Sequence, residues 1–434
     1  MSATLSTPGP APVTLAQAHG VWAGIGLRSF GGPTAQIALM HRVLVEERRW
    51  LSDREFLDAL GFCMLLPGPE AMQLATYAGW KMHGLAGGLA AGLWFVLPGA
   101  LVVLALSAIY SAFGHVPWIV AAFAGIKATV LVLVIEAMLR IGRRALVERR
   151  QVWVAAASLL SLGIFSVPYP LVVLAAGLLG WAWSRGARAE PRRRYEPVPI
   201  AATARTVVVW LAIWALPLLG VAAAFGPRHV LSQLAWFFSK LAVVTFGGAY
   251  AVLGYMSQDV VTRHGWLTAG QMLDGLGLAE TTPGPLILVT EFVGFVAAYR
   301  AHPEAAMAFG FAGAAVALWA TFAPCFLWVF LGGPYVERLR GNARLASALQ
   351  TVTAAVVGVI ANLAVSFAIV TLFREVRTVS ILGGEIPVPV WSEVDPFAVA
   401  VAAFAFVSLR FLHWHVVPVI LASALAGLVV KGLL

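Results

Sequence analysis

Long apolar runs fill this sequence, and charged residues gather in the short segments between them. The runs have the length of helices and show no alternating strand pattern, so we expect a helical bundle rather than a β-barrel. The pattern predicts apolar segments at 14–30, 55–82, 85–113, 118–139, 152–165, 169–183 and 206–225, followed by a second series from about residue 230. A charged amphipathic stretch, 36–54, separates the first two segments.

The same motifs occur twice, in one register. Matching residues stand 216 positions apart in Phe30-Gly31-Gly32 and Phe246-Gly247-Gly248, in Trp50-Leu51 and Trp266-Leu267, and in Pro67-Gly68-Pro69 and Pro283-Gly284-Pro285. Asp58 and Asp274 keep this offset as well. The shared register indicates a tandem duplication, with a first repeat at 13–185, a basic linker and an extra transmembrane helix at 186–228, and a second repeat at 229–434.

Composition places the chain in a membrane. Apolar residues make up 60% of the 434 positions and charged residues only 11%, whereas a soluble domain carries about 25% charged residues. The net charge of +9 does not indicate nucleic-acid binding, because the arginines cluster between apolar runs, as orienting charges do. The clusters at 140–150 and 185–205 should face the cytoplasm, as expected of a multi-pass membrane protein.

The relative orientation of the repeats depends on how often each repeat crosses the bilayer. If the Pro-Gly-Pro segment crosses once, the chain forms an all-α polytopic bundle of about 12–13 helices. An odd number of membrane crossings then separates each residue from its equivalent in the other repeat, so the two repeats are inverted. If that segment is re-entrant instead, the copies come out parallel. We favour inverted repeats with discontinuous helices, because they place the arginines at 338–344 inside.

The duplicated glycines and prolines indicate a binding site. Glycines inside an apolar helix free backbone N–H groups, and Pro33 can open a new helix whose N-terminus attracts an anion. Pro-Gly-Pro should unwind the chain and leave helix N-termini near Glu70 and Leu286. Broken helices in paired halves are typical of transporter sites. The structural alternatives are close helix packing at the glycines and a kink at the prolines.

Polar residues near these breaks are the candidates for chemistry. The candidate substrate-binding residues are Arg28, Ser29, Gly31, Gly32, Pro33, Gly68, Gln73, Lys127, Lys240, Thr245, Gly247, Gly248, Thr282 and Gly284. Candidate proton-coupling carboxylates are Glu70, Glu280 and Glu291. Salt bridges or snorkelling for the cations, and helix capping for the hydroxyls, are the alternatives. We expect no metal, cofactor or catalytic residues, because neither ligand spacing nor a nucleotide motif is present.

Taken together, the paired motifs resemble the chromate ion transporter family in its long-chain form with two homologous halves. The resemblance implies a bacterial inner-membrane carrier that exports chromate, with sulfate as a close mimic. It covers nearly the whole chain, but Ala249 stands where the first repeat has Pro33, so the two half-sites should be unequal.

We therefore expect a secondary transporter that exports chromate or a similar tetrahedral oxyanion by alternating access. The alternatives are an oxyanion channel and, from another class, a membrane-embedded enzyme or lipid-handling protein. The lipid bilayer is an expected partner, and the sequence leaves a homodimer open.

Overall fold

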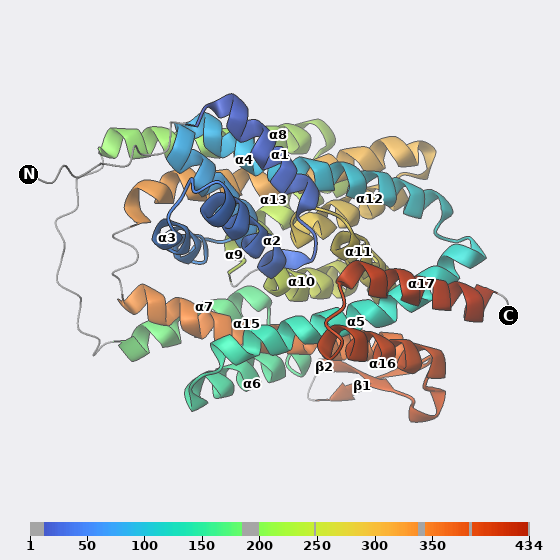
Figure 1. Ribbon diagram of the computed structural model, residues 1–434. Coiled ribbons are helices and arrows are strands. Elements are labelled where there is room, and N and C mark those ends of the chain that lie inside the picture. Colours follow the sequence, from blue (N-terminus) through green and yellow to red (C-terminus); the bar gives the residue numbers. More distant parts are fainter. Residues whose placement is uncertain (1–12, 185–198, 247–248, 337–342, 382–383, 433–434) are drawn as a thin grey trace, which may run out of the picture.

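Figure 1 shows the computed structural model, which is described over residues 13–184, 199–246, 249–336, 343–381 and 384–432. The helices of the first repeat are α1 (Leu15–Arg28), α2 (Gly32–His41), α3 (Asp53–Cys63), α4 (Glu70–Phe113), α5 (Pro117–Ala145), α6 (Arg149–Gly163) and α7 (Tyr169–Trp183). The extra helix is α8 (Ile200–Phe225). The second repeat holds α9 (Val230–Val244), α10 (Ala249–Gln258), α11 (Ala269–Thr281), α12 (Val289–Ala301), α13 (Ala306–Gly332), α15 (Ala343–Leu372), α16 (Pro396–Arg410) and α17 (Val416–Gly432).

Short elements complete the described chain. Two π-helical turns, Arg42–Glu47 and Asp259–Arg263, follow α2 and α10 at equivalent positions of the two repeats. Short 3-10 turns lie at Leu286–Leu288, Pro303–Ala305, Gly333–Tyr335 and Trp391–Glu393. An antiparallel hairpin of β1 (Val376–Ile381) and β2 (Gly384–Pro389) lies between α15 and α16.

Length and composition make this a multi-pass membrane protein. Within the described residues, the helices that are long and apolar enough to cross a bilayer are Glu70–Phe113, Pro117–Ala145, Ile200–Phe225, Pro303–Tyr335 and Ala343–Leu372. Shorter apolar helices are Tyr169–Trp183, Val230–Val244, Pro396–Arg410 and Val416–Gly432. The predicted all-α polytopic fold is confirmed.

Helix α4 is in fact two helices joined by a tight turn. His83 and Gly84 leave the helical conformation, and Gly84 has φ 60° and ψ −149°. Residues 70–83 then lie back along residues 85–113, with Gly79 against the backbone of Gly87. The second repeat builds the same pair from α12 and α13, where Gly294 faces Gly313. Small residues at these positions let the two helix backbones approach closely.

The Pro-Gly-Pro segments are re-entrant. Glu55, at the start of α3, pairs with Lys81 near the end of the following helix at 2.7 Å, so both ends of the segment lie together. In the second repeat, Arg300 donates to Gln271 at 3.0 Å and closes α11 against α12 in the same way. The assumption that this segment crosses once is therefore wrong.

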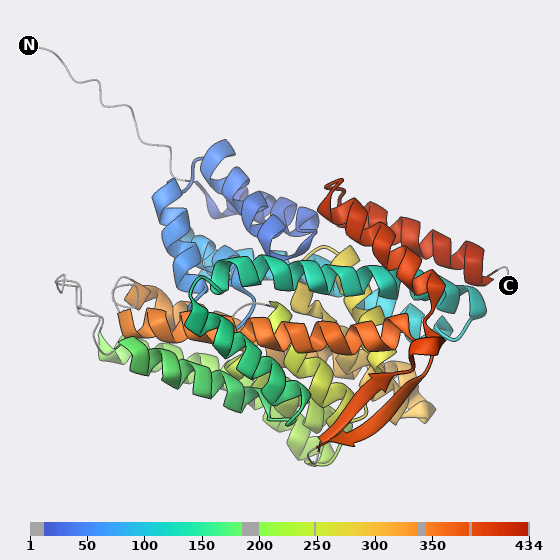
Figure 2. The same ribbon diagram turned by 90° about the horizontal axis from the view of Figure 1, so that it is seen from below.

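The Phe-Gly-Gly segments also turn back, which restores the inverted arrangement. Helix α1 and the π turn after α2 line one cavity, so the chain before the first Phe-Gly-Gly motif and the chain after it lie together. The two broken segments of a repeat therefore add no crossing of the membrane. The extra helix α8 adds one crossing between the repeats, so the second repeat lies in the opposite orientation to the first. In Figures 1 and 2, α5 and α15 lie side by side and run in opposite directions. The expected inverted repeats are confirmed.

The last two helices of each repeat pack on the opposite repeat. Gly180 of α7 lies against Ser347 and Thr351 of α15, and the equivalent Gly427 of α17 lies against Ala121 and Gly125 of α5. Helices α6 and α16 follow the same exchange, on α15 and α5 respectively (Figure 1). The two halves therefore form one core around α5 and α15 rather than two adjacent bundles.

Candidate functional site: the crossing of the broken helices

The two repeated motifs meet across the two halves through backbone hydrogen bonds. The N–H of Gly68 donates to the carbonyl oxygen of Thr245 at 3.1 Å, and the N–H of Gly284 donates to that of Ser29 at 2.9 Å. The two bonds are equivalent in the repeat register. Each Phe-Gly-Gly break therefore holds the Pro-Gly-Pro break of the other repeat, and both glycines adopt positive φ, 118° and 92°.

Each Pro-Gly-Pro loop lies against the proline-containing helix of the opposite repeat. The backbone of Pro283 touches Gly99, which follows Pro98 in α4. The equivalent residue in α13 is Cys325, whose Sγ lies 3.1 Å from the position that a Cβ on Gly68 would take. A larger residue than glycine at position 99 would collide with the loop backbone, so the crossing requires these small side chains.

Buried amides satisfy the carbonyl groups that the broken helices expose. Gln36 Nε2 donates to the carbonyl oxygen of Gly284 at 2.6 Å, and Gln73 Nε2 donates to that of Pro67 at 2.7 Å. Both glutamines are buried. Gln73 therefore supports its own loop, and its Nε2 already has a partner.

The N-terminus of α2 is the broken helix end that a cation faces. Gly31 and Gly32 take φ of 85° and 76°, and Pro33 stands at the start of the helix. Arg140 of α5 reaches this end, with Nη1 3.4 Å from the Thr34 hydroxyl oxygen. A helix N-terminus carries partial positive charge and unpaired N–H groups, so together with a guanidinium it suits an anion.

A phenol and a carboxyl complete this region from the second repeat. The Tyr250 hydroxyl lies 3.8 Å from the position of a Cβ on Gly32 and donates to Glu280 Oε1 at 2.7 Å. Glu280 is buried, and the positive charge of Arg140 acts on its carboxyl group. We call Gly31, Gly32, Thr34, Arg140, Tyr250 and Glu280 the central cluster. It combines a helix N-terminus, which suits an anion, with a buried carboxyl group.

The two candidate lysines are paired with carboxylates. Lys127 Nζ lies 3.4 Å from Asp274 Oδ2, and the Tyr110 hydroxyl donates to the same oxygen at 2.8 Å. Lys240 Nζ lies 3.8 Å from Asp259 Oδ2, which also faces Arg263 at 3.7 Å. Salt-bridge pairing, the structural alternative for these two residues, describes their present geometry.

Arg28 points away from the central cluster. Its Nε donates to the carbonyl oxygen of Gly24 at 2.8 Å, within its own helix. Its side chain is exposed and lines a cavity of about 460 Å³ between α1 and the π turn, together with Glu47 and Arg48. The assignment of Arg28 to substrate binding stays a prediction.

The candidate hydroxyl groups bond to their own helices. Ser29, Thr245 and Thr282 donate to the carbonyl oxygens of Ile25, Leu241 and Ala279 at 2.7, 2.5 and 3.1 Å. These bonds satisfy groups at the helix ends. Gly247 and Gly248 lie outside the described residues.

The three candidate carboxylates lie in different surroundings. Glu280 belongs to the central cluster, and Glu70 begins α4 within range of the Arg144 charge. Glu291 is fully buried in α12, and both of its oxygens lack a hydrogen-bond partner. An isolated buried carboxylate anion is very costly, and Glu291 has no hydrogen-bond partner among the described residues to offset that cost.

Sequence reasoning missed Arg140 and Tyr250 as members of this region. Arg140 belongs to the cluster at 140–150 that we expect to orient the chain, and its i, i+4 spacing from Glu136 would also suit an ion pair within the helix. In the structure Glu136 faces Arg410 of α16 at 3.9 Å instead. The available signal for Tyr250 was its place two residues after the second Phe-Gly-Gly motif.

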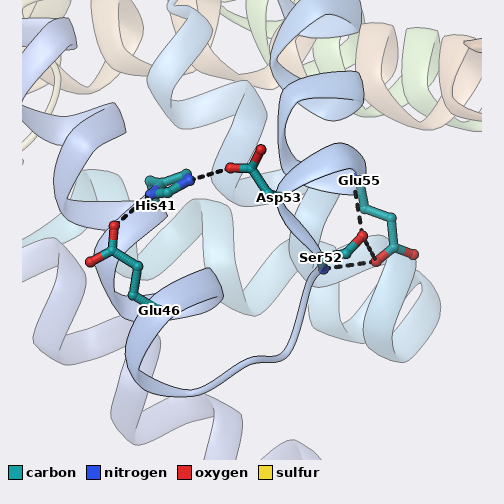
Figure 3. A network of polar contacts seen from close by, with 5 residues as sticks. All are labelled: His41, Glu46, Ser52, Asp53 and Glu55. Atoms are coloured by element: carbon teal, nitrogen blue, oxygen red, sulfur yellow. Dashed lines mark hydrogen bonds and ion pairs between the residues drawn. The ribbon is translucent and has the colours of Figure 1, made fainter.

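A polar network ties the two broken segments of the first repeat together (Figure 3). His41 lies between Glu46 Oε1 and Asp53 Oδ1, at 3.1 and 2.7 Å, while Ser52 caps α3 through Glu55. The hydrogen bond to Asp53 and the nearby Glu46 raise the pKa of His41 above its usual 6.5. The hydrogen bond from Lys81, with those from Ser52, lowers the pKa of Glu55 to about 2.

Comparison with known proteins identifies relatives along most of the chain. The family described as "Chromate transporter" matches residues 16–181 and 232–428, which correspond to the two repeats. A "Chromate transport protein" from Pseudomonas aeruginosa is 34% identical over 96% of this chain and 93% of its own length. One from Cupriavidus metallidurans is 30% identical over 77% of this chain and 78% of its own.

A shorter relative covers a stretch the size of one repeat. The "Uncharacterized transporter YwrA" of Bacillus subtilis is 29% identical over 157 residues, which make up 36% of this chain and 88% of its own length. No solved structure gives a significant match to this chain.

Proposed function

Because this chain belongs to the chromate transporter family, we propose that it is a secondary transporter that exports chromate, or a similar tetrahedral oxyanion such as sulfate, across the inner membrane. The observation that carries the proposal is the crossing of the broken helices, where each repeat holds the other by one backbone bond. Binding sites at the interface of inverted repeats are a general feature of such carriers.

The central cluster is the proposed site for the oxyanion. The N-terminus of α2 supplies N–H donors and partial positive charge, and Arg140 supplies a full charge with a planar pair of donors. Tyr250 can turn its hydroxyl between Glu280 and a bound oxygen. Ala249 gives the second repeat no proline at the equivalent position, which agrees with unequal half-sites.

Alternating access follows from the inverted halves. Rocking of one half against the other would open the crossing first to one side and then to the other. The arginine-rich end of α5 would face the cytoplasm. Glu280, Glu291 and Glu70 are the proposed proton-coupling groups, since buried carboxyl groups can gain and lose a proton during a cycle.

Uptake of labelled chromate into inverted membrane vesicles tests this function. We expect saturable uptake, acceleration by unlabelled chromate or sulfate on the opposite side, and a loss of about tenfold or more in Arg140→Gln. Arg150→Gln is the matched control, because Arg150 is exposed on α6 and pairs with Glu148. Normal uptake by Arg140→Gln at normal expression would remove the central cluster as the site, and non-saturable flux would indicate a channel.

A further inference from the structure

Four arginines surround a cavity at the C-terminal end of α5. Arg140, Arg143 and Arg144 of α5 and Arg410 of α16 line a space of about 210 Å³. Glu136 is the one acid among the lining residues that the structure describes, and its Oε1 lies 3.9 Å from Arg410 Nε. We call these five residues with Leu139 the arginine pocket. Its volume is below that of a drug-sized ligand site and fits a small ion.

The charges of the arginine pocket are not balanced within its lining. Arg140, Arg143 and Arg144 stand at i, i+3 and i+4 on one helix face, where like charges repel. One carboxylate faces four guanidinium groups, so the pocket keeps a strong positive potential that attracts anions. Arginines that only orient a helix in the membrane need to lie at its end. Here Arg410 of the opposite repeat also closes a cavity around them.

The arginine pocket adjoins both broken helix ends of the first repeat. Arg140 contacts Thr34 at the start of α2, and the charge of Arg144 acts on Glu70 at the start of α4. An anion held in the pocket would therefore lie next to the central cluster, with Arg140 belonging to both.

The equivalent positions of the other helices do not carry the arginines of this pocket. The repeat offset grows from 216 to 226 by Pro98 and Pro324, and to 247 by Gly180 and Gly427. At the offset of 226, Ser366, Ile369 and Val370 stand in α15 where α5 has Arg140, Arg143 and Arg144. Gly163 of α6 stands where α16 has Arg410. Because the repeats are inverted, the arginine pocket lies on one side of the membrane alone, which makes a symmetric scaffold directional.

We propose that the arginine pocket is the loading site, where a tetrahedral oxyanion is captured from the cytoplasm before it passes to the N-terminus of α2. The inference rests on the proposed transport function and deepens it by naming the side and residues of capture. The phosphate of an anionic lipid headgroup shares this chemistry, so the test separates the two sources.

The test uses the full chain, purified and reconstituted in vesicles of neutral phosphatidylcholine with the arginine-rich end outward. Labelled chromate uptake gives the half-saturating concentration and the maximal rate for Arg143→Gln, Arg410→Gln and the control Arg150→Gln. We expect the first two to raise the half-saturating concentration about tenfold or more at a nearly unchanged maximal rate, since each removes one charged hydrogen-bond donor. Arg143→Lys should recover part of the loss, because it restores the charge without the planar donors.

Each other outcome overturns the loading site. Unchanged half-saturation in both variants, with Arg140→Gln inactive, would reject the pocket and leave the proposed function standing. A defect that occurs only when phosphatidylglycerol is added to the vesicles would assign the pocket to a lipid headgroup. If all three arginine variants transport normally, both the pocket and the central cluster fail. Size-exclusion profiles in detergent identify variants that have unfolded. For those variants, a second assay replaces uptake: it measures whether sulfate protects the thiol of Arg143→Cys from a thiol reagent.

Discussion

At the residue scale, the repeated motifs act through backbone atoms. The sequence predicted that the glycines of both motifs would offer N–H donors to an anion. The structure instead uses the N–H groups of Gly68 and Gly284 to hold the opposite repeat, so these two donors are occupied in this conformation. Gly31 and Gly32 take positive φ at the start of α2, beside Arg140, and their assignment to substrate binding stays a prediction.

Gly99→Ala should disrupt the crossing. A Cβ at this position would collide with the carbonyl group of Pro283, and a backbone neighbour cannot move aside as a flexible side chain can. We expect a loss of about 1–3 kcal/mol or more in the free energy of unfolding, measured by thermal unfolding in detergent. Gly220→Ala in α8 is the control, since no atom lies within 4 Å of its added Cβ. Equal stability of the two variants would contradict the close approach.

Glu291→Gln tests the buried carboxyl group. Glutamine resembles the neutral acid, and both Glu291 oxygens lack partners, so we expect no loss in the thermal unfolding temperature. If Glu291 carries a proton during transport, the variant should lose most of the dependence of chromate uptake on external pH between about 6 and 8. Glu304→Gln, at an exposed position, should keep the wild-type profile. An unchanged profile in Glu291→Gln would remove it from the proton-coupling group.

At the scale of helices, the sequence predicted where segments break but not how they turn back. Segment 14–30 became α1, and segment 206–225 lies within α8, as expected. The re-entrant path brings Glu55 to Lys81, a contact between side chains that no local pattern in the sequence specifies. The stretch at 373–396 holds the β1–β2 hairpin, in which Val376 pairs with Pro389 and Val379 with Ile386, and we did not predict these strands from the sequence.

Protonation of His41 should stabilise the join between α2 and α3. Its folded-state pKa is raised above 6.5 by Asp53 and Glu46, so its contribution is complete below pH 6.5 and is lost as pH rises through the raised value. We expect the unfolding temperature of the wild type, relative to His41→Gln, to be higher at pH 6 than at pH 8. His115→Gln, at an exposed position in the turn between α4 and α5, is the control. A difference that grows with rising pH would contradict the assigned sign.

At the scale of the whole molecule, the two repeats complete each other. The sequence shows that Gly180 and Gly427 are equivalent, but it does not show that they pack on α15 and α5. A repeat register pairs equivalent positions and does not indicate which repeat each of them contacts. Helices α6 and α7 cover α15, while α16 and α17 cover α5. Each half on its own would therefore leave a packing face of its long helix uncovered.

A chain divided within the 186–198 linker should work only as a pair of halves. Expressed alone, each half lacks both the helices that cover its long helix and the carbonyl group that receives its Pro-Gly-Pro N–H, so we expect little folded protein. Co-expression of the two halves should restore most of the chromate uptake, because no described contact depends on the linker. The linker acts on the entropy cost of bringing the two halves together, and that cost changes only slowly with linker length. Affinity purification through a tag on one half should recover the other. A first half that transports chromate alone at the rate of the intact chain would show that the exchanged packing is dispensable. The exception is a first half that co-purifies with a second copy of itself, because α5 of that copy then takes the place of α15.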